Sequence, residues 1–158
     1  MQGKLIVVEG TDCSGKETQT KKFVERCEAK GIKVYNYSFP RYDTPTGKIV
    51  GGPYLGKSYI CDGWFPEGAP NVDALVASAY YAADRRYNIK EIMEHLNNGD
   101  IVLLDRYVES NMAHQGGKLD SKEERQKMYE KLIELEFGIM KLPRPDAVIF
   151  LYMPSSYA

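Results

Sequence analysis

The chain has 158 residues, 43% of them hydrophobic, which is enough for one domain with a hydrophobic core. Its 21 basic and 22 acidic residues leave a formal net charge of −1, so no overall field attracts nucleic acid or a membrane surface. No apolar run is long enough to span a bilayer, and residues 1–4 lead straight into the first apolar run without a signal peptide. We therefore expect neither nucleic-acid nor membrane partners.

The three cysteines, Cys13, Cys27 and Cys61, are odd in number and lack the spacing of a metal site. An odd number of cysteines without metal-site spacing is typical of proteins whose thiols stay reduced inside the cell. The prediction is a cytoplasmic protein.

The first predicted strand, Leu5–Glu9, is a short apolar run that leads into a phosphate-binding loop. The loop has Gly10, then four residues, then Gly15-Lys16, and a helix is predicted over Gly15–Lys30 with Gly31 as its C-cap. The glycines allow a tight turn in which backbone N–H groups point at an anion, while the lysine and the positive end of the helix dipole add charge. The predicted contacts of this loop are Gly10, Thr11, Asp12, Cys13, Ser14, Gly15, Lys16, Glu17 and Thr18.

Glu17 stands where this motif usually carries a serine or threonine whose hydroxyl meets Mg²⁺. A carboxylate can hold Mg²⁺ directly or through water. Asp105, at the tip of a later predicted strand, can hold the ion through water beside a phosphate loop. Glu17 and Asp105 are therefore the predicted magnesium ligands.

Strands and helices alternate along the rest of the chain. The other apolar runs also lack alternation, which indicates strands buried on both faces, as in a parallel sheet. The segment 47–70 is rich in glycine, proline and aromatic residues and predicts a short helix plus loop. This order indicates an α/β fold of three layers, a P-loop fold with a parallel sheet of about four strands and ligands at their carboxyl ends. The remaining predicted elements are the strands Val34–Phe39, Ile101–Asp105 and Ala147–Tyr152 and the helices Val72–Asn97 and Ser121–Phe137, the last opened by a capping box.

Only six residues, 153–158, follow the last predicted strand. A parallel strand at this position is normally followed by a covering helix. We therefore expect residues 1–158 to be a single domain truncated at its C-terminus, with the covering elements beyond Ala158.

Polar segments follow two of the strands. Phe39-Pro40-Arg41-Tyr42 follows the second strand, and Asp105-Arg106-Tyr107 closes the third. An arginine beside a phosphate loop can bind a second phosphate as a fork. A surface salt bridge for Arg106 and a loop charge for Arg41 are the alternatives that these residues allow by themselves.

The predicted helix Val72–Asn97 has two different faces. Tyr81 and Arg85 lie one turn apart on the face opposite to an apolar stripe. An aromatic ring and a guanidinium at this spacing can stack on a base and hydrogen-bond its edge, and an exposed Tyr–Arg pair is the alternative. The apolar stripe consists of Val72, Leu75, Val76, Ala79, Tyr80 and Ala83.

Together these motifs resemble the thymidylate kinase family, over residues 4 to 154. The resemblance rests on the loop that begins at Glu9, the segment after Phe39, the pair Asp84-Arg85, the segment 105–111, and Leu142-Pro143-Arg144-Pro145-Asp146. It implies transfer of the γ-phosphate of ATP to dTMP, with Mg²⁺, in a homodimer whose long helices pack together.

The resemblance also assigns roles to individual residues. It makes Lys16, Arg106 and Asp12 catalytic: the lysine contacts the ATP phosphates, and the aspartate approaches the deoxyribose 3′-hydroxyl. Arg106 and Arg41 bind the dTMP phosphate, and Arg85 meets the thymine O4 edge. The substrate-binding residues that it implies are Asp12, Phe39, Arg41, Tyr81, Arg85, Arg106, Ser110, Asn111, His114 and Gln115.

Besides Glu17, three features depart from the family pattern. Tyr81 replaces the usual stacking phenylalanine, and His114 replaces a tyrosine that crowds out a ribose 2′-hydroxyl. Residues 12–14 of the phosphate loop include no arginine. The last departure is typical of members whose transition-state arginine lies in a lid, which we expect beyond Ala158.

Other interpretations stay open at this point. A deoxynucleoside kinase or another nucleoside-monophosphate kinase shares the phosphate loop, and a nucleotide-binding regulator binds without turnover. Deoxynucleoside kinases use a carboxylate base at the strand end where this chain has Arg41. The arginine therefore favours a substrate that already bears a phosphate.

Overall fold

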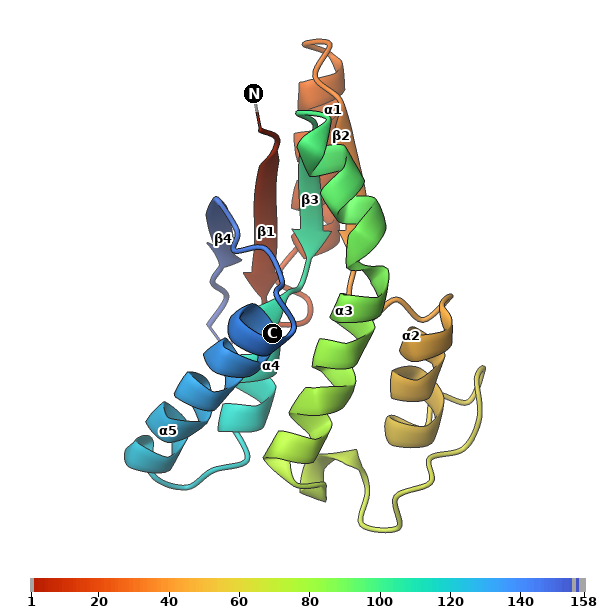
Figure 1. Ribbon diagram of the computed structural model, residues 1–158, viewed down its shortest axis with the longest axis vertical. Coiled ribbons are helices and arrows are strands. Elements are labelled where there is room, and N and C mark those ends of the chain that lie inside the picture. The colour runs from red at the N-terminus through yellow and green to blue at the C-terminus, as the bar shows by residue number, and fades with distance from the viewer. Residues whose placement is uncertain (1, 155, 157–158) are drawn as a thin grey trace. The chain divides into compact units, whose positions relative to one another are not determined.

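The computed structural model describes residues 2–154 and 156. Its four strands form one parallel sheet in the order β2-β3-β1-β4, with β1 and β3 in the centre (Figure 1). The strands are β1 (Lys4–Gly10), β2 (Val34–Ser38), β3 (Ile101–Asp105) and β4 (Ala147–Leu151). The helices are α1 (Lys16–Glu28), α2 (Pro45–Ile49), α3 (Ala74–Asn97), α4 (Val108–Gly116) and α5 (Lys122–Ile133), with π-helical segments at Val50–Tyr54 and Glu134–Ile139 and a 3₁₀ turn at Ala69–Asn71. The predicted α/β fold with a parallel sheet is confirmed.

The chain forms two compact units. The first, which we call the sheet unit, comprises residues 1–38, 90–107 and 144–158 and contains the four strands, α1 and the C-terminal turns of α3. The second, which we call the helical unit, comprises residues 39–89 and 108–143 and contains α2, most of α3, α4 and α5.

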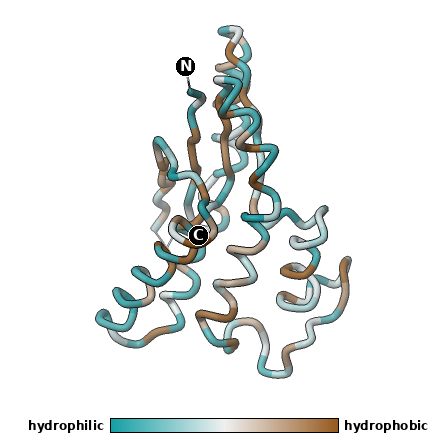
Figure 2. Tube along the Cα trace, in the orientation of Figure 1, coloured by the Kyte–Doolittle hydropathy of each residue, from teal (hydrophilic) through white to brown (hydrophobic). Residues whose placement is uncertain are grey.

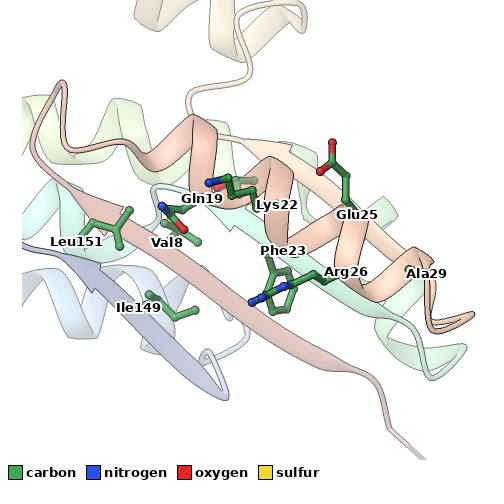
Figure 3. A pocket seen from close by; sticks show the side chains of 10 residues that line it. Val8, Gln19, Lys22, Phe23, Glu25, Arg26, Ala29, Ile149 and Leu151 are labelled. Carbon is green, nitrogen blue, oxygen red and sulfur yellow. The ribbon is translucent and has the colours of Figure 1, made fainter.

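In the sheet unit, the central strands β1 and β3 are buried, as their unbroken apolar runs predict. Val7, Val102, Leu103 and Leu104 are 0% exposed, and Figure 2 shows hydrophobic residues along both strands. Helix α1 and the C-terminal turns of α3 cover opposite faces of the sheet (Figures 1 and 3). The phosphate loop therefore leaves a strand that is fixed by neighbours on all sides.

Both edge strands differ from this expectation: no residue of β2 is fully buried, and β4 is more exposed still. Val148, Ile149 and Phe150 are 43%, 42% and 62% exposed, so the prediction that this strand is buried on both faces is wrong. The reason is that β4 pairs with β1 on one side only and that the described residues leave its faces largely uncovered.

An apolar groove of about 730 Å³ lies between α1 and strands β1 and β4 (Figure 3). Its lining includes Val8 of β1, Phe23 of α1, and Ile149 and Leu151 of β4, with charged side chains of α1 at its side. The groove accounts for the exposure of Ile149.

Helix α5 begins with the predicted capping box. The Ser121 Oγ accepts a hydrogen bond from the Glu124 N–H at 3.1 Å, and the Glu124 carboxylate accepts one from the Ser121 N–H at 3.1 Å. The predicted α-helix ends early, however, because the backbone is π-helical over Glu134–Ile139. The sequence analysis also missed α4, which begins directly after the segment Asp105-Arg106-Tyr107.

The two faces of α3 are the reverse of what the apolar stripe suggests. Leu75 and Val76 of the stripe are 48% and 44% exposed, whereas Asp84 and Arg85 are 1% and 3% exposed. The polar face is buried because other segments of the helical unit supply hydrogen-bond partners for it. The amphipathic pattern of one helix does not show whether other segments supply such partners.

Candidate active site

The phosphate loop connects β1 to α1 and has the backbone that the glycines predict. Gly15 has a φ of 85°, in the left-handed region that favours glycine. A Cβ at Gly10 would lie 2.7 Å from both the Leu151 O and the Ser14 Oγ, so a side chain is excluded there. The Ser14 Oγ is buried and has no hydrogen-bond partner among the described residues.

Lys16 is buried and folds back onto its own loop. Its Nζ donates hydrogen bonds to the Gly10 O and the Thr11 O, each at 2.9 Å. Lysine carries three donors and no acceptor. An anion that entered the loop would meet an ammonium group that already donates to two backbone carbonyls.

Arg106 and Asp12 come together at the carboxyl edge of the sheet. Arg106 follows β3, which pairs with β1 so that Asp105 is the register partner of Val8. The Arg106 backbone has a φ of 67°, and its N–H donates to the Val8 O at 3.1 Å. Its guanidinium forms an ion pair with the Asp12 carboxylate, in which the Asp12 side chain is 89% exposed. Both residues named as catalytic beside Lys16 thus face each other within the sheet unit.

Glu9, a motif residue with no role assigned to it from the sequence, holds this segment in place. Its carboxylate accepts a hydrogen bond from the Tyr107 N–H at 2.8 Å, and both residues are buried. The bond fixes the chain on the C-terminal side of Arg106. The signal that could have identified Glu9 is a carboxylate at the end of a strand that is otherwise apolar.

The predicted magnesium ligands are both in the sheet unit. Asp105 is half-buried, and its Oδ1 is buried without a hydrogen-bond partner among the described residues. Glu17 is exposed in the first turn of α1. No group of three or more metal-ligating side chains occurs in the described part of the chain. The carboxylate oxygens fit Mg²⁺, which is commonly bound through one or two carboxylates together with substrate phosphates.

In the helical unit, Asp84 of α3 anchors the segment that carries Arg41. The Asp84 carboxylate accepts hydrogen bonds from the Arg41 N–H at 2.9 Å, the Thr46 Oγ1 at 2.8 Å and the Asn88 Nδ2 at 2.9 Å. A Cβ at Gly47 would lie 1.6 Å from the Arg41 O, so only glycine permits this turn. The Arg41 guanidinium lies 3.6 Å from the Asp43 carboxylate and remains near the surface.

Arg85 is fixed by a residue that the sequence analysis missed. Its Nε–H donates to the Glu136 Oε2 at 2.8 Å, and its Nη2 pairs with the Glu136 Oε1. The Asn111 Nδ2 donates to the same Oε1 at 3.0 Å. Tyr81, one turn before Arg85, is half-buried and meets the Tyr54 ring edge-on, with ring centroids 5.8 Å apart.

The remaining predicted substrate residues differ in burial. In α4, Asn111 and Gln115 are 3% and 1% exposed, whereas Ser110 is half-buried and His114 is exposed. Phe39 is 2% exposed. Helix α4 therefore presents polar groups to the inside of the helical unit, where the side-chain oxygens of Asn111 and Gln115 have no hydrogen-bond partner among the described residues.

Lys118 ties the start of α3 to the end of α4. Its Nζ donates to the Val72 O at 2.9 Å and the Ala69 O at 3.1 Å, and Tyr54 donates to the same Ala69 O at 3.1 Å. Burial lowers the pKa of Lys118, and the charge of Asp73 opposes that shift. Burial raises the pKa of the Tyr54 hydroxyl, so this contact is made by a neutral phenol.

The order of strand, glycine–lysine loop and helix, with an arginine closing the neighbouring parallel strand, defines a P-loop protein of the nucleotide kinase class. The family model for thymidylate kinase matches residues 8–158. The chain therefore belongs to the thymidylate kinase family.

Curated relatives come from distant organisms. A probable thymidylate kinase of Pyrococcus horikoshii is 32% identical over 158 residues, which cover 98% of this chain and 67% of the relative. The thymidylate kinases of Schizosaccharomyces pombe and Homo sapiens are 33% and 30% identical, over 95% and 96% of this chain and 61% and 62% of theirs. The chain thus spans about three fifths to two thirds of the length of these relatives.

A solved structure supports the same assignment. The thymidylate kinase of Candida albicans matches with a TM-score of 0.68 and 26% sequence identity, over 99% of this chain and 65% of that one. In the described part of the chain, no helix combines the length and the apolar character that crossing a membrane requires.

Proposed function

We propose that the protein transfers the γ-phosphate of MgATP to dTMP, which gives ADP and dTDP. The observation that carries the proposal is the pairing of a phosphate loop, closed on Lys16, with Arg106 at the ends of neighbouring strands β1 and β3. Family membership supports the same reaction. Phosphoryl transfer depends mainly on positioning and on charge stabilisation, and both cations supply the latter.

In the sheet unit, the loop amides and Lys16 bind the ATP phosphates, and Arg106 binds the acceptor phosphate. Lys16 releases the Gly10 and Thr11 carbonyls to do so, and Arg106 releases the Asp12 carboxylate. Asp12 is then available for the deoxyribose 3′-hydroxyl. Asp105 and Glu17 would hold Mg²⁺, which would supply positive charge next to the phosphates.

In the helical unit, Arg41 binds the phosphate of dTMP, and the base site consists of side chains from α3 and α4. Tyr81 stacks on the base and Arg85 donates to its O4. Asn111 and Gln115 belong to the same site, with Ser110 and His114 on the exposed part of α4. Phe39 supports the Arg41 segment from inside the unit.

We further propose that the two units form one kinase domain that works in the cytoplasm as a homodimer. The exposed apolar stripe of α3 supports a dimer, because Leu75 and Val76 are 48% and 44% exposed on a long helix. A second copy of α3 would supply an apolar partner for these two residues.

A substrate panel tests the reaction. Purified protein is assayed with MgATP and thymidine, dTMP, dUMP, dCMP, dGMP and the corresponding ribonucleotides, with ADP release as the readout. The expected result is that dTMP is turned over fastest and that thymidine is not turned over. Turnover of thymidine without dTMP would instead indicate a deoxynucleoside kinase. Binding of dTMP and ATP without any turnover would indicate a nucleotide-binding regulator.

A further inference from the structure

The helical unit buries an ion pair between Arg85 and Glu136, whose side chains are 3% and 0% exposed. The two side chains are 51 residues apart in sequence and meet in a bidentate pair. Breaking such a pair leaves an uncompensated buried charge, whereas a pair of apolar residues would fill the same space without that risk. The pair also fixes the orientation of the Arg85 side chain.

The pair is formed side-on. Glu136 binds the Nε–H and the Nη2 of Arg85, and the guanidinium has five N–H donors in a rigid fork. Its Nη1 therefore remains a donor, and no partner for it occurs among the described residues. The carboxylate holds the arginine by one edge and leaves the other edge able to donate.

Glu136 also dictates how the Asn111 amide is turned. An ionised carboxylate only accepts, so Asn111 must present its NH₂ group, which donates to the Glu136 Oε1 at 3.0 Å and to the Ser78 O at 3.3 Å. The Asn111 Oδ1 then points elsewhere, and it is buried without a hydrogen-bond partner among the described residues. A buried acceptor in this state is available to a donor on a ligand.

The Glu136 carboxylate thus orients both Arg85, which keeps a donor, and Asn111, which keeps an acceptor. Thymine offers a matching edge, with an acceptor at O4 and a donor at N3–H. Cytosine offers the reverse edge, with a donor at N4 and an acceptor at N3. The two residues would leave two unsatisfied buried groups against cytosine.

We infer that Glu136 is a positioning residue that sets base selectivity, because it holds Arg85 as a donor and Asn111 as an acceptor for pyrimidines with a carbonyl at C4. The inference rests on the proposed function. Glu136 itself does not touch the nucleotide. Its effect is confined to recognition of the base, and binding of the phosphate and of ATP does not depend on it.

The variant Glu136→Gln tests the inference, because it keeps the size of the side chain but adds an N–H that the Asn111 Oδ1 can accept. Glu134→Gln, an exposed position in the same π-helical segment, is the matched control. Calorimetry measures binding of dTMP, dCMP, 2-deoxyribose 5-phosphate and ATP to each protein. In Glu136→Gln we expect the preference for dTMP over dCMP to fall about tenfold or more, the size expected when a site built to bond a polar group loses its match. Binding of 2-deoxyribose 5-phosphate and ATP should be unchanged in both variants.

An equal loss for all four ligands, or an unchanged ratio of dTMP to dCMP binding, overturns the inference. If wild-type protein binds no dTMP, the proposed function itself fails. If it binds dTMP and Glu136→Gln keeps the wild-type preference, only the inference fails.

A measurement on the wild type covers the case in which Glu136→Gln does not fold. The side-chain Nε–H of Arg85 is followed by NMR hydrogen exchange, because its bond to Glu136 protects it. The pair should persist when dTMP binds, so the Nε–H should stay protected and should shift with dTMP but not with 2-deoxyribose 5-phosphate. Loss of protection on dTMP binding would mean that Arg85 leaves Glu136 to reach the base, which contradicts a positioning role.

Discussion

Two regions of the molecule differ in how their cationic side chains are paired. One is the carboxyl edge of the sheet unit around Lys16 and Arg106, which we call the phosphate edge, and the other is the buried network of Arg85, Glu136 and Asn111 in the helical unit. Lys16 and Arg106 bind backbone carbonyls of the loop and the 89% exposed Asp12, partners that an anion can replace. Arg85 instead binds Glu136, which is 0% exposed and also engages Asn111. In the first region Lys16 is paired with backbone carbonyls and Arg106 with an exposed carboxylate, whereas in the second region Arg85 is paired with a buried carboxylate.

The difference follows from what each region is proposed to bind. A phosphate carries enough charge to displace the protein groups that are paired with these cations, and several donors can bind it from different directions. Discrimination between bases depends on single hydrogen bonds, which decide affinity only where an unmatched group is kept from water. A buried and rigid network is therefore suited to discrimination between bases.

The largest effect expected is on the phosphate edge. Lys16→Ala should lower kcat by about 10³-fold, because it removes a positioned charge from the transferring phosphoryl group. The melting temperature should hardly change, since the lysine bonds only to its own loop. Steady-state kinetics and a thermal melt measure the two quantities, with Lys21→Ala, exposed on α1, as the control. Unfolding of Lys16→Ala would show that the loop depends on the lysine for its structure.

Breaking the buried Arg85–Glu136 pair should lower the stability of the fold. Arg85→Met should lower the free energy of unfolding by about 3–5 kcal/mol, because it leaves Glu136 charged, buried and without its partner. Arg85→Met combined with Glu136→Met should recover most of this loss, since no charge is then buried. Urea denaturation measures both, with the exposed Arg86→Met as the control. A small change in the free energy of unfolding for Arg85→Met would mean that the Glu136 carboxylate is not excluded from water.

Arg106→Ala should have a smaller effect than either of these changes. It should weaken dTMP binding about 10- to 100-fold and ATP binding much less, because it removes a charged fork from the acceptor phosphate. Stability should change by less than about 1 kcal/mol, as the partner Asp12 is largely in water. Calorimetry with each nucleotide checks this, with Lys22→Ala as the control. Equal losses for both nucleotides would contradict the assigned role.

The smallest effect concerns pH and the attachment of the segment before β4. The Asp146 carboxylate accepts from the Leu5 N–H at 2.9 Å and from Lys4 at 3.1 Å, and these bonds hold its pKa below the ordinary 3.8. A lowered carboxyl pKa adds stability above pH 3.8, and this contribution is lost as pH falls through the lower folded pKa. Asp146→Asn should therefore melt slightly below wild type at neutral pH. The two melting curves should converge in acid, and a gap that persists there would contradict this assignment.

Local patterns in the sequence were enough for much of the fold and for the phosphate loop. Strand β3 matches its predicted bounds, the Gly10–Lys16 loop lies between a buried strand and a helix, and the capping box of α5 is present. Each of these depends on residues that are close together in the chain. Their steric and hydrogen-bonding preferences can therefore be inferred from the local sequence, without knowledge of the rest of the molecule.

Only the tertiary structure decided which polar groups meet. Glu136 reaches Arg85 across 51 residues, Asp84 binds the Arg41 segment across 43, and Glu9 binds the Tyr107 N–H across 98. These contacts also reversed the expected faces of α3, since partners from other segments made its polar side the buried one. A charge can be buried only if folding brings a counter-charge or a hydrogen-bond partner to it. The periodicity of one helix does not show whether such a partner exists elsewhere in the chain.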